Sequence, residues 1–352
     1  MKIVLVTPLL DLGGGQRYVS EMANYWSSKG HSVSIIVLRG GKPFYSINSD
    51  VKIIKLCLCK GIRIKKAVGI VKSFIKLRKT IKEIQPDFVL SILSSTNIFT
   101  LISTRFLNVR VFVRDAMSPF RKRSKKERFL RKLLYKKADG VILLTKIAKD
   151  FVEAETGATN VKVIHNPVSH VNKFNDIKKE KIVITAGRLT SVKAQHFILE
   201  ACAKINKSDW TFVILGEGEL REKLNNQIES LGIKNRVLMP GAVKNLDLWL
   251  NKSMIFVSTS ISEAWGNAIC EAMAVGLPVV SFDCDVGPRE MIDDGENGFL
   301  VPVGDVDLFT KKIVLLMNDK NLRNKFSVNT EEIQRKFSID AISKEVLEFC
   351  SN

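Results

Sequence analysis

Short apolar runs alternate with longer stretches of helical periodicity along the first half of the chain. The runs are rich in Val, Ile and Leu, which is typical of strands that are buried on both faces. They lie at residues 3–7, 33–38, 88–93, 109–113 and 141–144, with helical patterns at 16–29, 64–84 and 125–137. Strands that alternate with helices form parallel sheets with crossover helices, so this half predicts a doubly wound α/β domain.

A second series of the same kind follows His165-Asn166-Pro167. Its apolar runs lie at residues 182–186, 211–215, 237–239, 254–258 and 278–282, with helical patterns at 195–205, 220–231 and 267–275. Because a proline ends regular structure, we place a domain boundary there. The pattern predicts an N-terminal domain of residues 1–167, a C-terminal domain of residues 168–335, and a last helix, 336–352, that crosses back to the first domain. The predicted fold class is α/β, with two Rossmann-like domains facing a central cleft that binds ligands at the strand ends.

The composition agrees with a chain that folds throughout. Hydrophobic residues make up 45% and charged residues 26% of the 352 positions, close to the averages of globular proteins. No apolar run approaches the roughly 20 residues that span a bilayer. The six cysteines show no C-x-x-C pair and the four histidines no metal-ligand spacing. We therefore expect a cytoplasmic, reduced protein without a metal site.

Charge is divided very unevenly between the two halves. Residues 1–150 hold 31 Lys and Arg against 9 Asp and Glu, whereas residues 151–352 hold 24 against 27. A surface this basic attracts nucleic acid, anionic lipid or pyrophosphate-linked substrates, and a merely solvated surface is the alternative. Aromatic residues make up only 8% of the chain, and no basic recognition helix with stacking aromatics is present. We therefore expect no nucleic-acid partner.

Two glutamates, Glu263 and Glu271, bracket the start of the predicted helix at the fourth strand of the second half. A helix N-terminus suits pyrophosphate, and Gly266 lets a ligand approach the backbone of Trp265 and Asn267 closely. Glu263 then reaches ligand hydroxyls from the loop, and Glu271 accepts hydrogen bonds from a vicinal diol. The alternative is structural: Glu263 caps the helix and Glu271 pairs with a surface lysine.

Two cations, Arg188 and Lys193, follow the first strand of the second half. There they can bind a departing diphosphate, and ordinary surface charge is the alternative. Glycine-rich turns follow two other strands, at Gly13-Gly14-Gly15 and Gly216-Glu217-Gly218. The first is not the G-x-G-x-x-G of dinucleotide-binding enzymes, and no acidic residue ends the second strand. These departures count against a nicotinamide-dependent dehydrogenase.

In order and spacing, these pieces resemble glycosyltransferase family 4, whose members are retaining enzymes of the GT-B fold. The resemblance covers essentially the whole chain. The matching pieces are Gly13-Gly14-Gly15, Asn166-Pro167, Gly187-Arg188 with Lys193, Gly216-x-Gly218, Ser262-Glu263, Glu271-Ala272-Met273-Ala274 and Gly276-x-Pro278-Val279-Val280. The resemblance implies transfer of a hexose or N-acetylhexosamine from a UDP-sugar donor, with no cofactor and no bound metal.

The resemblance also implies roles for the matching residues. Arg188 and Lys193 bind the donor diphosphate, Glu263 binds the donor sugar near the reacting carbon, and Glu271 binds the ribose. The acceptor hydroxyl attacks on the face of the leaving diphosphate, which takes its proton, so that no dedicated base is needed. The remaining implied donor contacts are the backbone of Trp265, Gly266 and Asn267 for sugar and phosphate, Gly216, Gly218 and Met239 for the base, and Gly14 or Gly15 for the phosphates.

One stretch departs from the family pattern. Many relatives carry a histidine, or a Glu-Arg-Asn type segment, after the strand at 109–113. This chain has Val113-Arg114-Asp115 there. Asp115 is therefore our candidate for the catalytic group that touches the transferred sugar.

The acceptor is expected to bind the first domain. Helix 64–84 has an apolar stripe and a separate basic face, and a second basic run starts at Arg121. The stripe consists of Ile70, Phe74, Leu77, Ile81 and Ile84, and the basic face of Lys65, Lys72, Lys76 and Lys79. Such surfaces suit an anionic membrane, so we hypothesise an enzyme at the inner face of the cell membrane that extends a polyprenyl-diphosphate-linked glycan of a surface polysaccharide or glycoprotein. The alternatives are a stripe that is packed core, and an epimerase or phosphorylase of the same fold.

Overall fold

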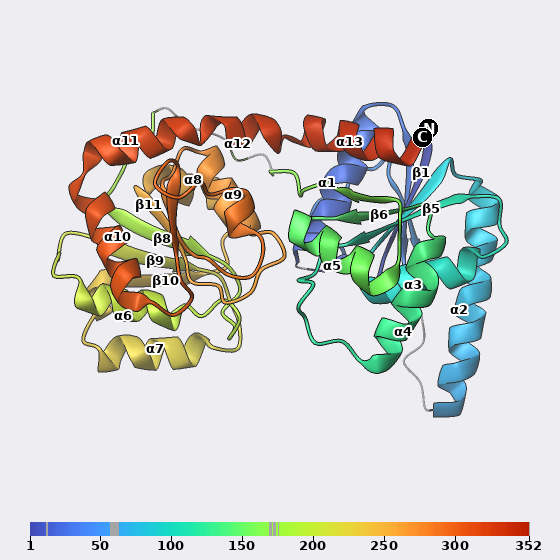
Figure 1. Ribbon diagram of the computed structural model, residues 1–352, viewed down its shortest axis with the longest axis horizontal. Coiled ribbons are helices and arrows are strands. Elements are labelled where there is room, and N and C mark those ends of the chain that lie inside the picture. The colour runs from blue at the N-terminus through green and yellow to red at the C-terminus, as the bar shows by residue number, and fades with distance from the viewer. Residues whose placement is uncertain (12, 57–62, 169–170, 172–173, 175, 352) are drawn as a thin grey trace. The chain divides into compact units, whose positions relative to one another are not determined.

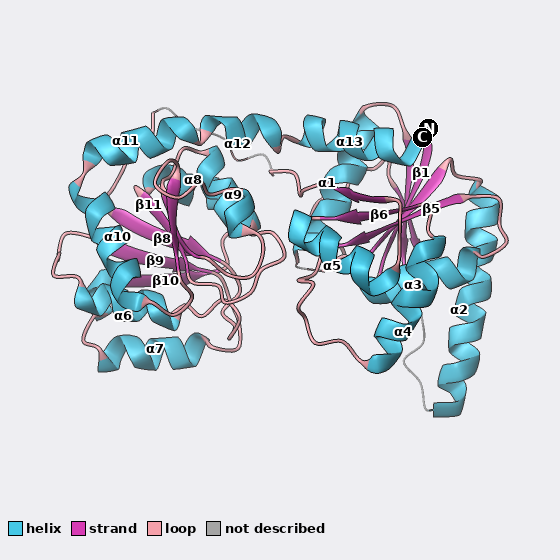
Figure 2. Cartoon of the chain, in the orientation of Figure 1, coloured by secondary structure: helices cyan, strands magenta, loops and turns pink. Residues whose placement is uncertain are grey.

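The computed structural model describes residues 1–11, 13–56, 63–168, 171, 174 and 176–351 (Figure 1). The chain forms two compact units, one of residues Met1–Pro167 with Ile339–Asn352 and one of residues Val168–Ser338. Each unit contains a parallel sheet with helices packed against it (Figure 2). The prediction of two doubly wound α/β domains is confirmed.

The sheet of the first unit has the strand order β3-β2-β1-β4-β5-β6-β7. Its strands are β1 (Lys2–Thr7), β2 (Ser32–Val37), β3 (Lys52–Lys55), β4 (Phe88–Ile92), β5 (Arg110–Asp115), β6 (Gly140–Leu143) and β7 (Val161–Val163). Its helices are α1 (Gly14–Ser28), α2 (Arg63–Ile84), α3 (Ser94–Thr104), α4 (Lys125–Leu134), the 3₁₀ turn η1 (Tyr135–Lys137), α5 (Lys146–Thr156) and α13 (Ile339–Ser351). The strand order reverses between β1 and β4, where doubly wound sheets have their crevice.

Different helices cover the two faces of this sheet. On one face, Val89 and its neighbours pack into a core with apolar residues of α2, α3, α4 and α5. On the other face, the rings of Phe88 and Phe112 meet Trp26 of α1 and Phe349 of α13 edge to face. Residues next to each other on a strand point to opposite faces, so the alternation along β4 and β5 divides the two cores.

The last helix of the chain, α13, belongs to the first unit and lies beside α1 (Figure 1). Its apolar residues Ile342, Val346 and Cys350 are fully buried and follow the spacing of one helix face. The Ser343 hydroxyl accepts a hydrogen bond from Nε1 of Trp26 at 2.8 Å. The helix therefore docks through an apolar stripe that one buried hydrogen bond accompanies.

The apolar stripe that we expected α2 to offer to a membrane is packed core. Leu77 and Ile81 are 0% and 1% exposed. The ring of Phe74 stacks on Phe99 of α3, with 4.2 Å between ring centroids, and Ile84 packs against the same core. The stripe was a wrong basis for membrane contact, because α2 has to bury one apolar face against α3 and the sheet.

The outer face of α2 is both basic and apolar. Lys72, Lys76 and Lys79 are exposed there, and so are Val71 and Ile75. The side chains of the other two residues in the expected pattern, Lys65 and Ile70, lie outside the described residues. In the part of the chain that the structure describes, no helix combines the length with the apolar character that a membrane span needs.

A buried arginine at the end of β5 holds the last segment of the first unit before the boundary. The guanidinium of Arg114 donates to the carbonyl oxygens of Ile164 (3.1 Å) and His165 (3.2 Å) and to Oδ1 of Asn166 (2.7 Å). It also lies 3.9 Å from the ring centroid of Tyr18. Burial lowers the pKa of Arg114. These acceptors stabilise its charge and explain why an asparagine precedes Pro167.

The sheet of the second unit has the strand order β10-β9-β8-β11-β12-β13. Its strands are β8 (Ile182–Ala186), β9 (Thr211–Leu215), β10 (Val237–Gly241), β11 (Ile255–Ser258), β12 (Val279–Phe282) and β13 (Gly298–Val301). Its helices are α6 (His196–Lys204), α7 (Arg221–Ser230), η2 (Lys234–Arg236), α8 (Leu246–Lys252), α9 (Asn267–Ala274), η3 (Pro288–Glu290), α10 (Val306–Asn318), α11 (Lys320–Asn329) and α12 (Glu331–Lys336). Here the order reverses between β8 and β11.

Candidate active site

The carboxyl ends of β8 and β11 lie side by side where the strand order of the second sheet reverses. From β8 the chain goes on to β9, on one side, and from β11 it goes on to β12, on the other. The loops after these two strands therefore diverge, and ligands of doubly wound sheets bind in the crevice that this leaves. Both charged motifs of the second half lie on these two loops.

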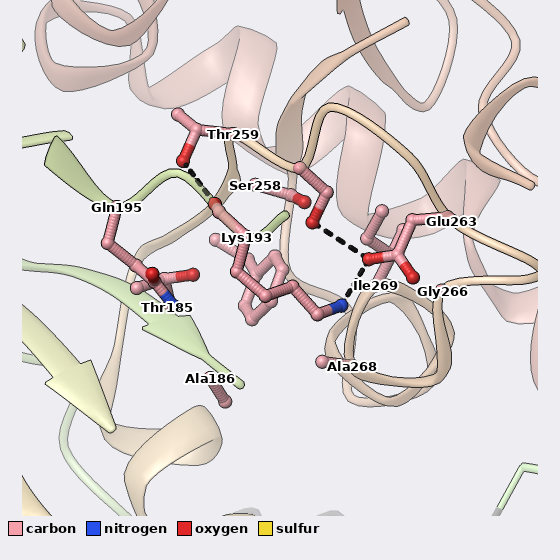
Figure 3. A pocket seen from close by; sticks show the side chains of 12 residues that line it. Thr185, Ala186, Lys193, Gln195, Ser258, Thr259, Glu263, Gly266, Ala268 and Ile269 are labelled. Carbon is pink, nitrogen blue, oxygen red and sulfur yellow. Dashed lines mark hydrogen bonds and ion pairs between the residues drawn. The ribbon is translucent and has the colours of Figure 1, made fainter. Parts of the chain in front are cut away.

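A pocket lies in this crevice (Figure 3). Lys193, from the loop after β8, forms an ion pair with Glu263, from the loop after β11, and their side chains are 27% and 12% exposed. The cavity volume is about 10 Å³, room for one water molecule. The lining residues are Thr185, Ala186, Lys193, Gln195, Phe256, Ser258, Thr259, Ser260, Glu263, Gly266, Ala268 and Ile269.

Two hydroxyl groups directly after β11 support the two members of the ion pair. Oγ of Ser260 donates to Oε1 of Glu263 at 2.8 Å, and this is the oxygen that also pairs with Lys193. Oγ1 of Thr259 donates to the carbonyl oxygen of Lys193 at 3.1 Å (Figure 3) and to that of Ala194 at 3.0 Å. Glu263 is thus held through its carboxylate, and Lys193 through its backbone.

Arg188 stands at the start of the loop after β8 with its side chain exposed. It forms no ion pair with any residue that the structure describes, so its charge is open to a ligand. Its backbone is fixed from the pocket side, because Nε2 of the buried Gln195 donates to the Arg188 carbonyl oxygen at 2.9 Å. Arg188 does not line the pocket of Lys193 and Glu263, but it belongs to the same anchored loop.

The Gly216–Gly218 turn packs against the loop that carries Arg188. A Cβ on Gly216 would overlap with the carbonyl oxygen of Gly187, and a Cβ on Gly218 with that of Leu189. Backbone hydrogen bonds of 2.9 Å join the two segments. These glycines are therefore required by the close approach of two backbones, which fixes the segment on both sides of Arg188.

The turn at the end of β10 is hydrogen-bonded to the Gly216–Gly218 turn. The N–H of Gly216 donates to the carbonyl oxygen of Gly241 at 2.8 Å. Met239 is half-buried, and its carbonyl oxygen accepts a hydrogen bond from Arg221 at 2.7 Å. The structure thus brings together the two segments, 216–218 and 239–241, against which we expect the nucleotide base.

The first turn of α9 faces the pocket. Gly266 is the N-cap, with a φ of +105° that favours glycine, and within the described residues no side chain caps the helix. Gly266 and Ala268 line the pocket, so the positive end of the helix dipole is directed at the ion pair (Figure 3). Asn267 is the first helical residue. Trp265 is 2% exposed, and its ring meets Phe337 edge to face at 5.0 Å.

Glu271 lies one turn further along α9 and is 3% exposed. It is not among the residues that line the pocket. The structure therefore brings Lys193, Glu263 and Gly266 together, keeps Arg188 on the loop of Lys193 but outside the pocket lining, and buries Glu271 behind the first turn of the helix. Ribose binding by Glu271 stays a prediction.

Two buried cysteines near the site remain neutral thiols. Burial raises the pKa of Cys270 well above its ordinary value, with the Glu271 carboxylate as the second cause. Burial, followed by the carboxylate of Glu263, raises the pKa of Cys284 to about 12. A thiol is a poor nucleophile, so neither cysteine is a candidate for nucleophilic attack. No group of three or more His, Cys, Asp or Glu within the described part of the chain is placed to hold a metal ion.

In the first unit, the glycine turn lies at that sheet's own reversal point. Gly14 and Gly15 begin α1 directly after the loop that follows β1. A Cβ on Gly15 would lie 3.6 Å from the side chain of Leu93, at the end of β4. Contact of Gly14 or Gly15 with the phosphates of the donor stays a prediction.

Asp115 ends β5 and is buried in a network of charged groups. Its carboxylate pairs with Arg131 of α4, and the two side chains are 1% and 0% exposed. Arg131 also binds Glu155 of α5 at 2.9 Å. Burial alone lowers the pKa of Arg131, but the Asp115 carboxylate raises it, and the net shift is upward. In the described structure, Asp115 holds β5 to α4.

Three residues that contact the site were not singled out from the sequence: Gln195, Thr259 and Ser260. All three are buried. A signal was present, because Thr259 and Ser260 directly follow a predicted strand and precede Glu263, and buried hydroxyls need hydrogen-bond partners. The partners of Thr259 lie on the loop after β8, about 65 residues earlier in the chain, and so could not be found locally.

Two family models together match residues 12–333. Residues 12–171 match "Glycosyltransferase Family 4", and residues 169–333 match "Glycosyl transferases group 1". With the geometry of the second sheet, these matches define the chain as a glycosyltransferase, and it is therefore an enzyme. It belongs to the family 4 glycosyltransferases, as its motifs predict.

Similar proteins cover the whole chain. An α-1,4-N-acetyl-D-galactosaminyltransferase of Campylobacter jejuni, named for a glycan acceptor on PP-undecaprenol, is 29% identical over 99% of this chain and 97% of its own. The amylovoran biosynthesis glycosyltransferase AmsD of Erwinia amylovora is 26% identical over 92% of both chains. The crystal structure of Anabaena HepE in complex with UDP superposes with a TM-score of 0.83 at 19% identity, over 100% of both chains. The last comparison confirms the GT-B fold.

Proposed function

We propose that this glycosyltransferase moves a hexose or N-acetylhexosamine from a UDP-sugar to a growing glycan, with retention at the anomeric carbon. The observation that carries the proposal is the convergence of Lys193, Glu263 and the first turn of α9 on one pocket, with Arg188 on the same loop as Lys193. Cations and a helix N-terminus suit a diphosphate, and a carboxylate suits sugar hydroxyls. The UDP bound to HepE supports a uridine nucleotide.

Arg188, Lys193 and the N-terminus of α9 act electrostatically in the proposed reaction. When the bond between the anomeric carbon and the diphosphate breaks, negative charge develops on the leaving phosphate. Arg188, Lys193 and the α9 dipole stabilise that charge, and preorganised groups of this kind contribute about 2.7–4 kcal/mol each to other enzymes. The acceptor hydroxyl attacks from the same face, and its proton passes to the leaving phosphate oxygen. Positioning supplies the rest of the acceleration, and neither a metal nor a further cofactor takes part.

Glu263 is proposed to bind the hydroxyls of the donor sugar beside the reacting carbon. Glu271 is proposed to bind the ribose, which requires the donor to reach behind the first turn of α9. Gly216, Gly218 and Met239 are proposed to border the base, since their segments are hydrogen-bonded to each other. Gly14 and Gly15 are proposed to meet the phosphates from the first unit.

A lipid-linked glycan is the acceptor that we propose. The C. jejuni relative is named for an acceptor on PP-undecaprenol, and AmsD for amylovoran synthesis. Both names support assembly of a bacterial surface glycan. The excess of positive charge in residues 1–150 would attract the diphosphate of such a carrier.

We further propose peripheral contact between the first unit and an anionic membrane, through a basic apolar surface. This surface consists of the exposed apolar side chains Val71, Ile75, Phe106, Phe129 and Leu133 together with the lysines and arginines around them. Val71 and Ile75 share one face of α2, and Phe129 and Leu133 one face of α4, with α3 packed between these helices. Phe106 follows α3 and is 88% exposed.

Anionic lipid is the partner that fits this surface. Exposed aromatic rings beside lysines bind the headgroup region of a bilayer, and the charge of the surface selects anionic lipids. The exposed lysines and arginines on α2 and α4 include Lys72, Lys76, Lys79, Lys125, Lys126, Arg128 and Lys132. The acidic residues of these two helices, Glu83 and Glu127, both pair with cations.

A coupled assay tests the proposed transfer. The wild type is incubated with a panel of nucleotide sugars, with and without EDTA, and with an undecaprenyl-diphosphate-linked glycan. We expect an extended glycan and free UDP from at least one UDP-sugar, unchanged by EDTA. Release of UDP without a glycoside, or interconversion of the UDP-sugar, would favour a phosphorylase or an epimerase instead. Co-sedimentation with vesicles tests the membrane contact, which fails if anionic vesicles retain no more protein than neutral ones at low salt.

A further inference from the structure

The loop after β11 presents two adjacent hydroxyl groups to the pocket, one to the side chain of Glu263 and one to the backbone at Lys193. Thr259 and Ser260 are 1% and 3% exposed. The hydroxyl of Ser260 contacts the carboxylate of Glu263, and that of Thr259 contacts the backbone of the Lys193 loop. We infer that Ser260 and Thr259 are positioning residues for the transfer reaction, the first for Glu263 and the second for Lys193. The inference rests on the proposed function of this pocket.

Ser260 determines which oxygen of Glu263 is offered to the ligand. Oε1 accepts from Ser260 at 2.8 Å and also pairs with Lys193. Oε2 has no partner among the described residues. The terminal torsion of a glutamate is broad and poorly restrained by itself. With Oε1 bound twice, the carboxylate is held in one orientation and Oε2 is left for a sugar hydroxyl.

Thr259 holds a strained turn directly after Lys193. Ala194 has a φ of +47°, one of the few positive values among non-glycine residues in the described chain. This left-handed conformation is strained for a residue with a Cβ. The hydroxyl of Thr259 binds the carbonyl oxygens on both sides of this turn, those of Lys193 and Ala194. The threonine therefore stabilises the conformation that directs Lys193 into the pocket.

The two contacts predict different kinetic effects. Loss of the Ser260 hydroxyl frees the carboxylate that meets the sugar near the reacting carbon, so it should lower kcat. Loss of the Thr259 hydroxyl relaxes the lysine that binds the donor diphosphate, so it should raise the KM for the donor and weaken UDP binding. If the two hydroxyls served folding alone, their loss would lower the melting temperature and leave both kcat and the donor KM unchanged.

A double-mutant cycle tests the role of Ser260. The variants are Ser260→Ala, Glu263→Gln and the double variant, assayed with the preferred UDP-sugar. We expect S260A to lower kcat about tenfold with less than a twofold change in donor KM. In the E263Q background, S260A should change kcat by less than twofold, because a positioning residue has no effect once its target is altered. Equal losses in both backgrounds would overturn the inference for Ser260.

Thr259 is tested with Thr259→Val, which keeps the shape, and Thr259→Ser, which keeps the hydroxyl. We expect T259V to raise the donor KM and the Kd for UDP about fivefold, and T259S to restore both to within twofold of the wild type. The matched controls are Ser253→Ala and Thr330→Val, which remove buried hydroxyls bound to backbone carbonyls elsewhere in the unit. They should leave both constants unchanged.

The outcomes separate the inference from the proposed function. If the wild type transfers no sugar from any UDP-sugar, the proposed function fails and the inference fails with it. If the wild type is active but T259S is no better than T259V, or the controls change the constants as much, only the positioning roles are overturned.

Discussion

A carboxylate paired with a cation lies at the end of β5 and another on the loop after β11, but the two pairs differ in their exposure to solvent. In the first unit, Asp115 and Arg131 are 1% and 0% exposed, and Arg131 is also bound by Glu155. In the second unit, Glu263 and Lys193 are 12% and 27% exposed and line a pocket. A fully buried pair joins elements of the fold, whereas a partly exposed pair beside a helix N-terminus is arranged to meet a ligand.

The exposed charges of the two units differ as well. The second half is almost neutral, and its site cations lie on loops that glycines and hydroxyls hold in place. The excess charge of the first half lies largely on outer helix faces, interspersed with exposed apolar residues. This contrast suits one half that binds a small anion at a fixed site and another that meets a larger anionic surface.

The largest effect is expected when the buried pair of the first unit is broken. Arg131→Met leaves the carboxylates of Asp115 and Glu155 without their cation, and breaking a buried pair typically costs about 3–5 kcal/mol of unfolding free energy. Urea unfolding followed by circular dichroism measures the change. Lys132→Met, an exposed neighbour on α4, is the control. If R131M lowered the unfolding free energy by less than about 1 kcal/mol, the buried pair would not have the structural role that distinguishes it from the pair of Lys193 and Glu263.

The next effect is on catalysis and concerns the open cation of the second unit. Arg188→Ala is expected to lower kcat/KM about 10²-fold, because it removes a charge that stabilises the leaving diphosphate, while the melting temperature stays within a few degrees. The transfer assay and a thermal melt give the two values. Lys181→Ala, an exposed lysine of the same unit, should change neither. An R188A activity within threefold of the wild type would remove Arg188 from the site.

A smaller effect is expected from the glycines that fix the Arg188 loop. Gly216→Ala places a Cβ against the carbonyl of Gly187 and should weaken UDP binding at least tenfold. The matched control is Gly232→Ala, which has a positive φ of +67° but no atom within 4 Å of the added Cβ. That variant should cost only roughly 1–2 kcal/mol of stability and leave UDP binding unchanged. Calorimetric titration compares the two, and equal affinities would mean that the close approach has no part in donor binding.

The smallest effect concerns the outer surface of the first unit. Phe106→Ser with Phe129→Ser should reduce retention on anionic vesicles severalfold while leaving turnover of a short, water-soluble acceptor unchanged. Phe44→Ser, which removes another exposed ring of this unit outside the basic apolar surface, serves as the control. Equal retention of all three proteins would place the membrane contact elsewhere.

Most of the fold could be predicted because the two sheets are buried on both faces. Their strands are continuous apolar runs, and the predicted strands match the structure to within a residue or two at most ends. Other elements were not anticipated. α3 is rich in Ser and Thr, which disfavour helices in isolation, and it forms because Thr96, Asn97 and Thr100 find partners or packing in the interior. β3 has only four residues and half-buried side chains, so its pattern is too short to recognise.

The candidate site was predictable in part. Glycines, cations and glutamates at strand ends indicate a diphosphate site, because the topology of a doubly wound sheet brings strand ends together. The pairing of Lys193 with Glu263 depends on which strands are neighbours, and the contacts of Thr259 depend on the conformation of Ala194, which no local pattern reveals. The apolar stripe of α2 was correctly recognised but wrongly assigned to a membrane. Helical periodicity indicates an apolar face, but it does not show whether protein or lipid covers that face.

The central claim is that the donor site lies on the β8 and β11 loops of the second unit. Calorimetric titration of UDP tests it most directly, with the wild type, Arg188→Ala combined with Lys193→Ala, and Lys72→Ala combined with Lys76→Ala as a first-unit control of equal charge change. The account predicts that the R188A/K193A protein binds UDP at least 50-fold more weakly than the wild type and that the control stays within twofold. Equal affinity in all three proteins, or no binding of UDP to the wild type, would contradict it.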